Sequence, residues 1–393
     1  MSTIVSISTA PGIGGIGIIR MSGEKSFEIL DKIFKPKTSQ KIEDIKGYTI
    51  KYGHIVENNE IIDEVLVSYF KAPRSYTTEN MCEINSHGGN VVVKKILEIC
   101  LKNGAELAEP GEFTKRAFLN GRIDLAQAES VIDVINAKSD KEAKSGIKQL
   151  EGYLSKEIKG IKQEILDVLV NIEVTIDYPE YDTPEVQEKE IAQMLESVGK
   201  KLKKLEKSFD NGKIIKDGIK TAIIGKPNAG KSSLLNAILK EDRAIVTDIA
   251  GTTRDTIEEF VTINGIPLNL VDTAGIREAS DEVEKIGVEK SIKQANDADL
   301  IIAIFDSSKD LEEEDIEILN LIKGKKSIIL LNKSDLNSKI NENDDRFTSI
   351  TENILRISAL NKYGIDELYE KIAELFNLNE INLDNEILIT NIR

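Results

Sequence analysis

The chain has 393 residues, which is enough for two or three domains with cores of their own. A formal net charge of −16 disfavours non-specific binding to nucleic acid or anionic membrane, although a local basic patch remains compatible with it. Two cysteines, Cys82 and Cys100, argue against a disulfide framework and indicate a reducing compartment, where both would be buried small hydrophobes. No apolar run spans a bilayer and the N-terminus has no signal-peptide pattern, so we expect a cytoplasmic protein without membrane attachment.

Residues 1–117 mix short strands with one clear helix, a pattern typical of an α+β domain. Thr3–Ser8 reads as a strand. Gly53–Ala72 holds two β-rich runs around Asn58-Asn59, which predict a hairpin. Gly88-Gly89 then predicts the start of a helix that reaches about Leu101.

Residues 118–214 have a helical pattern. Apolar residues recur every three or four positions from Ile147 to Leu169, which predicts one long helix, and the same spacing returns from Ile191 to Leu205. The segment Tyr178–Pro184 interrupts the two patterns. We therefore expect a bundle of long helices whose apolar stripes serve core packing.

Residues 215–378 alternate strands with helices, which predicts a doubly wound, mainly parallel sheet. Gly225–Ser233 fits the phosphate-loop pattern G-x-x-x-x-G-K-[ST] and lies between an apolar strand, Ile219–Ile224, and an apolar helix. Backbone N–H groups of such a loop can approach phosphates closely. Lys231 can reach the β and γ oxygens, and the Ser232 hydroxyl can bind Mg²⁺.

Three further motifs, each after a strand, indicate that the nucleotide is GTP. In Asp272–Gly275 the carboxylate can reach the magnesium shell and the last N–H can meet the γ-phosphate. In Asn332–Asp335 the Asp335 carboxylate can accept hydrogen bonds from guanine N1–H and its 2-amino group, which adenine does not offer. Ser358–Leu360 can present a backbone N–H to the guanine carbonyl. The motif residues assigned to the nucleotide are Asn228, Ala229, Gly230, Lys231, Ser232, Ser233, Asp272, Thr273, Ala274, Gly275, Asn332, Lys333, Asp335, Ser358, Ala359 and Leu360.

The chain resembles the MnmE (TrmE) family of bacterial tRNA-modifying GTPases over essentially its whole length. Thr247–Asp255 and Asp272–Ala279 resemble the two switch segments of the family. Related GTPases share parts of these, whereas Ala10–Gly23, Ser86–Gly89 and Pro110–Leu125 are similar to the N-terminal region of this family in particular. The resemblance adds the first switch to the nucleotide site: Thr247, Asp248, Ile249, Ala250, Gly251, Thr252 and Thr253.

The resemblance implies three domains. These are a dimerising folate-binding α+β domain (1–117), a helical domain (118–214, continued by 379–393), and a Ras-like P-loop GTPase domain (215–378) inserted into the helical one. It also implies a partner, the flavoprotein MnmG (GidA). The two proteins would add a 5-carboxymethylaminomethyl-type group to C5 of the wobble uridine of certain tRNAs. The carbon would come from a tetrahydrofolate derivative, either 5-formyl or 5,10-methylene.

By matching motifs, the resemblance assigns folate binding to Arg20, Glu83 and Arg122. Two guanidinium groups can hold carboxylate or carbonyl oxygens, and a carboxylate can accept the N–H pair of a pterin. Ordinary surface charge pairing is the alternative for each of the three.

The mechanism that the resemblance implies depends on two cations. Ile276 stands where many small GTPases have a glutamine that orients the attacking water. A K⁺ ion could instead neutralise charge between the β- and γ-phosphates. The residues assigned to K⁺ are Asn228, Thr247, Ile249 and Thr252. Those assigned to Mg²⁺ are Ser232 and Thr253. Glu284 would orient the water, with an acidic surface turn as the alternative.

Two other functions compete with this prediction. A ribosome-assembly GTPase shares the G motifs but usually carries a basic RNA-binding domain, and a folate-binding scaffold could use its G domain only to sense nucleotide. Members of the resembled family usually continue through another helical stretch to a Cys-x-Gly-Lys tail, whereas this chain ends at Arg393. We therefore expect these residues to give GTPase activity without tRNA modification.

Overall fold

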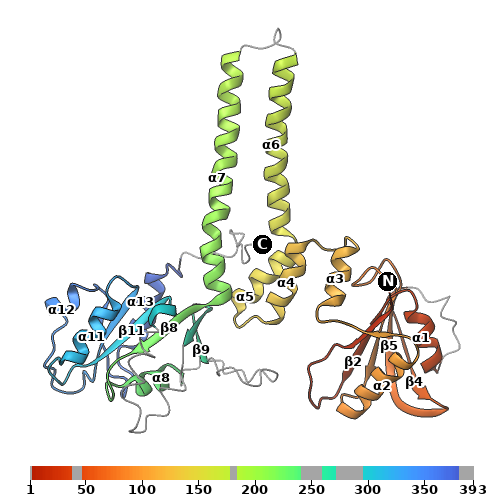
Figure 1. Ribbon diagram of the computed structural model, residues 1–393, viewed down its shortest axis with the longest axis horizontal. Coiled ribbons are helices and arrows are strands. Elements are labelled where there is room, and N and C mark those ends of the chain that lie inside the picture. The colour runs from red at the N-terminus through yellow and green to blue at the C-terminus, as the bar shows by residue number, and fades with distance from the viewer. Residues whose placement is uncertain (1, 38–46, 178–183, 240–258, 271–294, 380–393) are drawn as a thin grey trace. The chain divides into compact units, whose positions relative to one another are not determined.

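The computed structural model describes residues 2–37, 47–177, 184–239, 259–270 and 295–379 (Figure 1). Contacts divide the chain into two compact units, residues 1–132 and 133–393. The composition is mixed α/β, with two sheets and a set of long helices. Site residues that the sequence predicts lie in both units.

The first unit is built on a seven-stranded sheet in the order β3-β4-β5-β6-β2-β1-β7. Its pairs are antiparallel except for β1 with β7. The strands are β1 (Ile4–Ile7), β2 (Gly17–Ser22), β3 (Phe34–Pro36), β4 (Thr49–Glu57), β5 (Glu60–Phe70), β6 (Met81–Ser86) and β7 (Glu106–Leu107). The helices are α1 (Ser26–Ile33), α2 (Asn90–Lys102), α3 (Glu112–Leu119) and α4 (Leu125–Ile135), the last of which continues into the second unit.

The predicted hairpin and helix of this unit are confirmed. Asn58 and Asn59 have φ values of 52° and 67° between β4 and β5, and α2 follows Gly89. One face of the sheet packs on α1 and α2, and both cysteines lie in that core, as expected. Burial raises the pKa of the Cys100 thiol to about 12, so it stays protonated and unreactive.

In the second unit α5 (Asp140–Leu150) is followed by two long helices, α6 (Tyr153–Asp177) and α7 (Pro184–Asp217), which contact each other. The prediction of one helix from Ile147 to Leu169 is therefore wrong. Gly152 has a φ of 78°, and its N–H donates to Gln149 O, which ends α5 in a left-handed turn. The stripe itself is partly buried: its member Ile161 is 5% exposed, and Val168, the residue before its member Leu169, is 3% exposed. Other members are between 37% and 52% exposed, namely Ile147, Ile158, Ile165 and Leu169.

The rest of the second unit is a six-stranded sheet in the order β13-β12-β11-β8-β10-β9, parallel except for β9 with β10. This confirms the doubly wound, mainly parallel fold. Its strands are β8 (Ile219–Ile224), β9 (Glu259–Ile263), β10 (Ile266–Leu270), β11 (Leu300–Asp306), β12 (Ser327–Asn332) and β13 (Ile354–Arg356). Its helices are α8 (Lys231–Leu239), α11 (Glu313–Ile322), α12 (Asp345–Thr348) and α13 (Ile365–Leu375).

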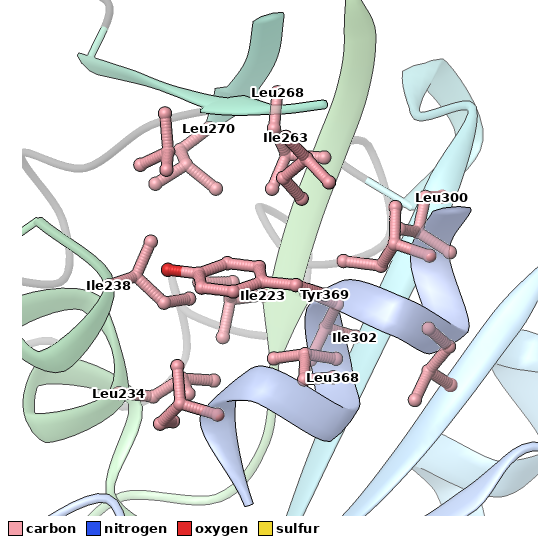
Figure 2. Packing of buried hydrophobic residues seen from close by; sticks show 14 of the residues in the cluster. Ile223, Leu234, Ile238, Ile263, Leu268, Leu270, Leu300, Ile302, Leu368 and Tyr369 are labelled. Carbon is pink, nitrogen blue, oxygen red and sulfur yellow. The ribbon is translucent and has the colours of Figure 1, made fainter. Parts of the chain in front are cut away.

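Alternate residues of the central strands pack into two separate hydrophobic cores, one on each face of the sheet. Ile302 of β11 belongs to the core made with α8 and α13, which Figure 2 shows around Tyr369. Its neighbours Ile301 and Ala303 belong to the core made with α11 and α12. Burial on both faces fixes where β8, β11 and β12 end, and the polar motifs begin at those ends.

Candidate functional site

The loop between β8 and α8 depends on two glycines. A Cβ on Gly225 would lie 2.5 Å from the Ile304 carbonyl oxygen, and one on Gly230 would lie 2.0 Å from Asn332 Nδ2. Gly230 also has a φ of 108°, and Asn228 beside it has a φ of 63°. The chain therefore passes the ends of β11 and β12 at a distance that side chains would block.

Lys231 begins α8 and folds back over this loop. Its Nζ donates to the carbonyl oxygens of Gly225 at 2.6 Å and Lys226 at 2.8 Å. Burial lowers the pKa of the Lys231 ammonium, because the charged form loses solvation. The loop thus brings a cation and the N–H groups of a helix N-terminus to one place, which suits a phosphate chain.

Asn332 joins the three motifs that lie within the described residues. Its Nδ2 donates to Ala229 O at 2.8 Å in the phosphate loop, and its Oδ1 accepts from Ala359 N at 3.0 Å. The residue is 3% exposed. Asn332 was predicted as a nucleotide contact, and the structure gives it a bridging position between the two halves of the site.

Asp335, which the sequence predicts as the residue that reads the base, is held by a hydrogen bond from the third motif. Ser358 Oγ donates to Asp335 Oδ1 at 2.6 Å and accepts from Asn361 N at 3.3 Å. One oxygen of the carboxylate is therefore held by a hydroxyl that is itself fixed to the backbone. Ala359 is buried and Leu360 is exposed, so of the three residues of this motif only the last projects into solvent.

Sequence reasoning missed Asp306, which ends β11 opposite Asn332 at the end of β12. Its Oδ2 accepts from Lys333 Nζ at 2.6 Å, and its Oδ1 accepts from the Ser308 hydroxyl. Burial alone would raise the pKa of Asp306, but the hydrogen bonds from Lys333 and Ser308 outweigh it and lower the pKa. Asp306 therefore stays ionised and orients Lys333. Its position at the carboxyl end of a parallel strand was the available signal.

The three residues predicted to bind folate converge in the first unit. Arg20 and Glu83 are opposite each other on β2 and β6, and Arg20 Nε donates to Glu83 Oε1 at 2.8 Å. Arg20 and Arg122 both lie over the ring of Tyr76, with Cζ-to-centroid distances of 5.8 Å and 4.8 Å. The Tyr76 hydroxyl is hydrogen-bonded to Thr114 at 2.9 Å. Sequence reasoning missed Tyr76, because both arginines that contact its ring lie far from it in the chain and leave no local signal.

Sequence reasoning also missed Arg116, a buried arginine of α3. Its side chain is 4% exposed, and its Nη2 lies 2.8 Å from Glu112 Oε1. Its Nη1 donates to Ser2 O at 2.7 Å and lies 3.2 Å from Glu79 Oε2. A buried arginine with two carboxylates and a backbone carbonyl ties α3 to the N-terminal end of the chain.

Known families match both parts of the chain. A family model described as the GTP-binding protein TrmE N-terminus matches residues 3–122, and the MnmE helical domain model matches residues 125–393. A Clostridioides difficile protein named tRNA modification GTPase MnmE is 52% identical over 393 residues, which span 100% of this chain and 85% of that protein. The namesake from Finegoldia magna is 53% identical over 390 residues, with 99% and 85% covered. The chain belongs to the MnmE family.

MnmE membership makes the chain a GTP-binding protein and a GTP hydrolase, as predicted. It also favours the MnmE prediction over the alternative of a ribosome-assembly GTPase. No helix in the part of the chain that the structure describes is long and apolar enough to cross a membrane.

Both switch segments lie outside the described residues. The predicted site residues among them are Thr247, Asp248, Ile249, Ala250, Gly251, Thr252, Thr253, Asp272, Thr273, Ala274 and Gly275. Glu284, which follows the second switch, lies outside the described residues as well. Residues 178–183 of the interrupting segment Tyr178–Pro184 also fall there, and so does Ile276, which stands at the glutamine position. Their predicted roles remain predictions.

Proposed function

We propose that this chain uses GTP hydrolysis to drive a tRNA modification carried out together with the flavoprotein MnmG. The pair would add a 5-carboxymethylaminomethyl-type group to C5 of the wobble uridine. MnmE family membership supports this proposal, because the curated relatives are tRNA modification GTPases. In this proposal residues 1–117 bind folate, 118–214 with 379–393 form the helical domain, and 215–378 form the G domain.

The proposed GTP site uses Asp335 for the guanine and the loop around Lys231 for the phosphates. Its residues fit both cations. Asn228 has an exposed carboxamide at a positive φ, for which no hydrogen bond is described, so its oxygen can ligate K⁺. Ser232, exposed in the first turn of α8, would hold Mg²⁺ together with Thr253. Bound cations would neutralise charge on the phosphates, and Glu284 would orient the attacking water.

The Arg20, Glu83 and Arg122 group fits a tetrahydrofolate. The Tyr76 ring offers a planar surface, two guanidinium groups offer donors for carboxylate and carbonyl oxygens, and Glu83 offers acceptors for pterin N–H groups. The side chains of Arg20 and Glu83 are 30% and 18% exposed, so both remain accessible to a ligand. When bound, the folate, 5-formyl or 5,10-methylene, would supply the one-carbon unit.

Homodimerisation through the first unit belongs to the same proposal. The sheet face opposite α1 and α2 carries exposed apolar side chains on neighbouring strands. Tyr52 and Leu66 are directly paired in the β4–β5 register and are 41% and 48% exposed, and Ile50 beside them is 65% exposed. Apolar surface of this kind on a sheet favours contact with a second protein.

The observation that carries the proposal is the occurrence in one chain of a guanine-type site and the Arg20–Glu83–Arg122 group around Tyr76. Nucleoside analysis of tRNA from cells lacking this protein tests it. We expect the modified wobble nucleoside to disappear and to return when the wild-type protein is supplied. Its return would overturn the expectation from the sequence that these residues give GTPase activity without tRNA modification. An Arg20→Ala variant should fail to restore it while keeping GTP turnover. Normal wobble nucleosides in the deleted cells would refute the proposed role.

Two measurements on purified protein separate the mechanism from a nucleotide-sensing scaffold. Steady-state GTP turnover should be substantial and faster in K⁺ than in Na⁺, whereas a scaffold would show neither. Glu284→Ala should slow turnover without weakening nucleotide binding, because the residue is assigned to the water. Weakened binding in that variant would contradict the assignment.

A further inference from the structure

Four lysines form a stripe along one side of α7. Lys200, Lys203, Lys204 and Lys207 are spaced by three and four residues, which places them on one face of the helix, and all four are exposed. The opposite side of α7 faces α6: Val198 is 5% exposed there, and Lys201 pairs with Glu164 of α6. The lysine stripe therefore lies on the side of α7 opposite to α6, the helix that runs beside it in Figure 1.

The stripe is positively charged, whereas the chain as a whole is negatively charged. Residues 199–209 contain five lysines and one glutamate, in a protein whose net charge is −16. Lys200 pairs with Glu196 at 2.8 Å, whereas no ion pair is described for Lys203, Lys204 or Lys207 within the residues that the structure covers. Three ammonium groups thus face solvent together, although like charges on one helix face repel each other.

The stripe is suited to a polyanion rather than to a protein. Protein interfaces are built around apolar or aromatic residues, and the lysine face of α7 has none between Lys200 and Lys207. Phosphate backbones are bound by lysine and arginine without an apolar centre. From Lys200 to Lys207 the helix rises about 10 Å, the length over which one strand of a duplex presents about three phosphates.

We propose that this lysine stripe on α7 binds the sugar–phosphate backbone of tRNA. The inference rests on the proposed function in one respect, namely that tRNA is the substrate of this chain. Lysine contacts to phosphates carry no sequence information, so the stripe would position any tRNA and leave the choice of nucleoside to the rest of the complex.

The experiment compares two triple variants of the full chain with the same net charge. Lys203→Gln, Lys204→Gln and Lys207→Gln removes the stripe, and Lys156→Gln, Lys159→Gln and Lys162→Gln removes three exposed lysines of α6. Binding of an unmodified tRNA transcript is measured by fluorescence anisotropy between 50 and 200 mM KCl. Circular dichroism and GTP turnover equal to wild type establish that both variants fold.

We expect the stripe variant to reduce the slope of log K against log salt by about two to three, and the α6 variant to leave it near wild type. The affinity lost by the stripe variant should then be about 16- to 64-fold larger at 50 mM than at 200 mM salt. If the stripe variant keeps the wild-type salt slope, or if both variants lose the same affinity for tRNA, the proposal that the stripe binds tRNA is wrong. The proposed role of tRNA as substrate is not affected by that result. Loss of poly-glutamate binding with an unchanged tRNA slope would assign the stripe to an acidic protein instead. Absence of tRNA binding by the wild-type chain overturns the proposed role of tRNA as well.

Discussion

Substituting Asp335→Asn should exchange the preference of this protein from GTP to xanthosine triphosphate. The carboxylate would accept two hydrogen bonds from guanine, and a hydrogen bond to a charged group contributes about 1.5–3 kcal/mol. Losing both costs about 3–6 kcal/mol, or about 10²- to 10⁴-fold in affinity for GTP. The asparagine amide can instead donate to the 2-oxo group of xanthine.

The structure makes this substitution a clean test. Ser358 Oγ donates to Asp335 Oδ1, and asparagine retains an Oδ1 acceptor, so the side chain should keep its orientation. Affinities for GTP and xanthosine triphosphate can be measured by isothermal titration calorimetry. Asp366→Asn, the same change at an exposed position on α13, is the matched control and should alter neither affinity. Unchanged GTP affinity in Asp335→Asn would remove this residue from the base site.

Three further predictions concern the phosphate loop, its contact with Asn332, and the first unit. Asn228→Ala should abolish the faster GTP turnover in K⁺ over Na⁺ while nucleotide binding persists; a retained K⁺ effect would contradict the ion assignment. Gly230→Ala should weaken GTP binding at least tenfold, because the new Cβ would lie 2.0 Å from Asn332 Nδ2, and titration with labelled GTP checks it. The hydrogen bond to Asp63 raises the pKa of His87, so any stabilisation from this pair is present below the ordinary pKa and is lost as pH rises through the raised one. NMR titration should show the His87 pKa falling in Asp63→Asn, and an unchanged pKa would refute the pairing.

Much of the fold could be predicted because local patterns and tertiary packing agree. The strand Ile219–Ile224 has the same bounds in the sequence prediction and in the structure, since an apolar run ending at a glycine loop has few alternatives. The prediction of one long helix across Gly152 was wrong because the local pattern and the actual backbone disagree there. The apolar spacing continues through that glycine, while the backbone uses its freedom to turn.

The parts of the site that were missed depend on residues far apart in the chain. Lys333 lies in a recognised motif, but its partner Asp306 is 27 positions away and has no motif of its own. Arg116 reads as one charge in a mixed helix, and its burial follows from contact with Ser2, 114 positions earlier. Pattern and spacing identify which residues carry chemistry, whereas the side chains that orient them are determined by tertiary structure.

The double role of Asn332 has a consequence for how the nucleotide site gains and loses order. The Asn332 carboxamide donates to a carbonyl of the phosphate loop and accepts from an N–H of the loop that contains Ala359. Both loops are therefore held by the same side chain. We therefore expect the two loops to open and close together. If the site residues act as predicted, a triphosphate bound to the first loop would also steady Ala359, and a guanine bound to the second would also steady the phosphate loop. Each half of GTP would then favour binding of the other half, and loss of either hydrogen bond of Asn332 would loosen both loops.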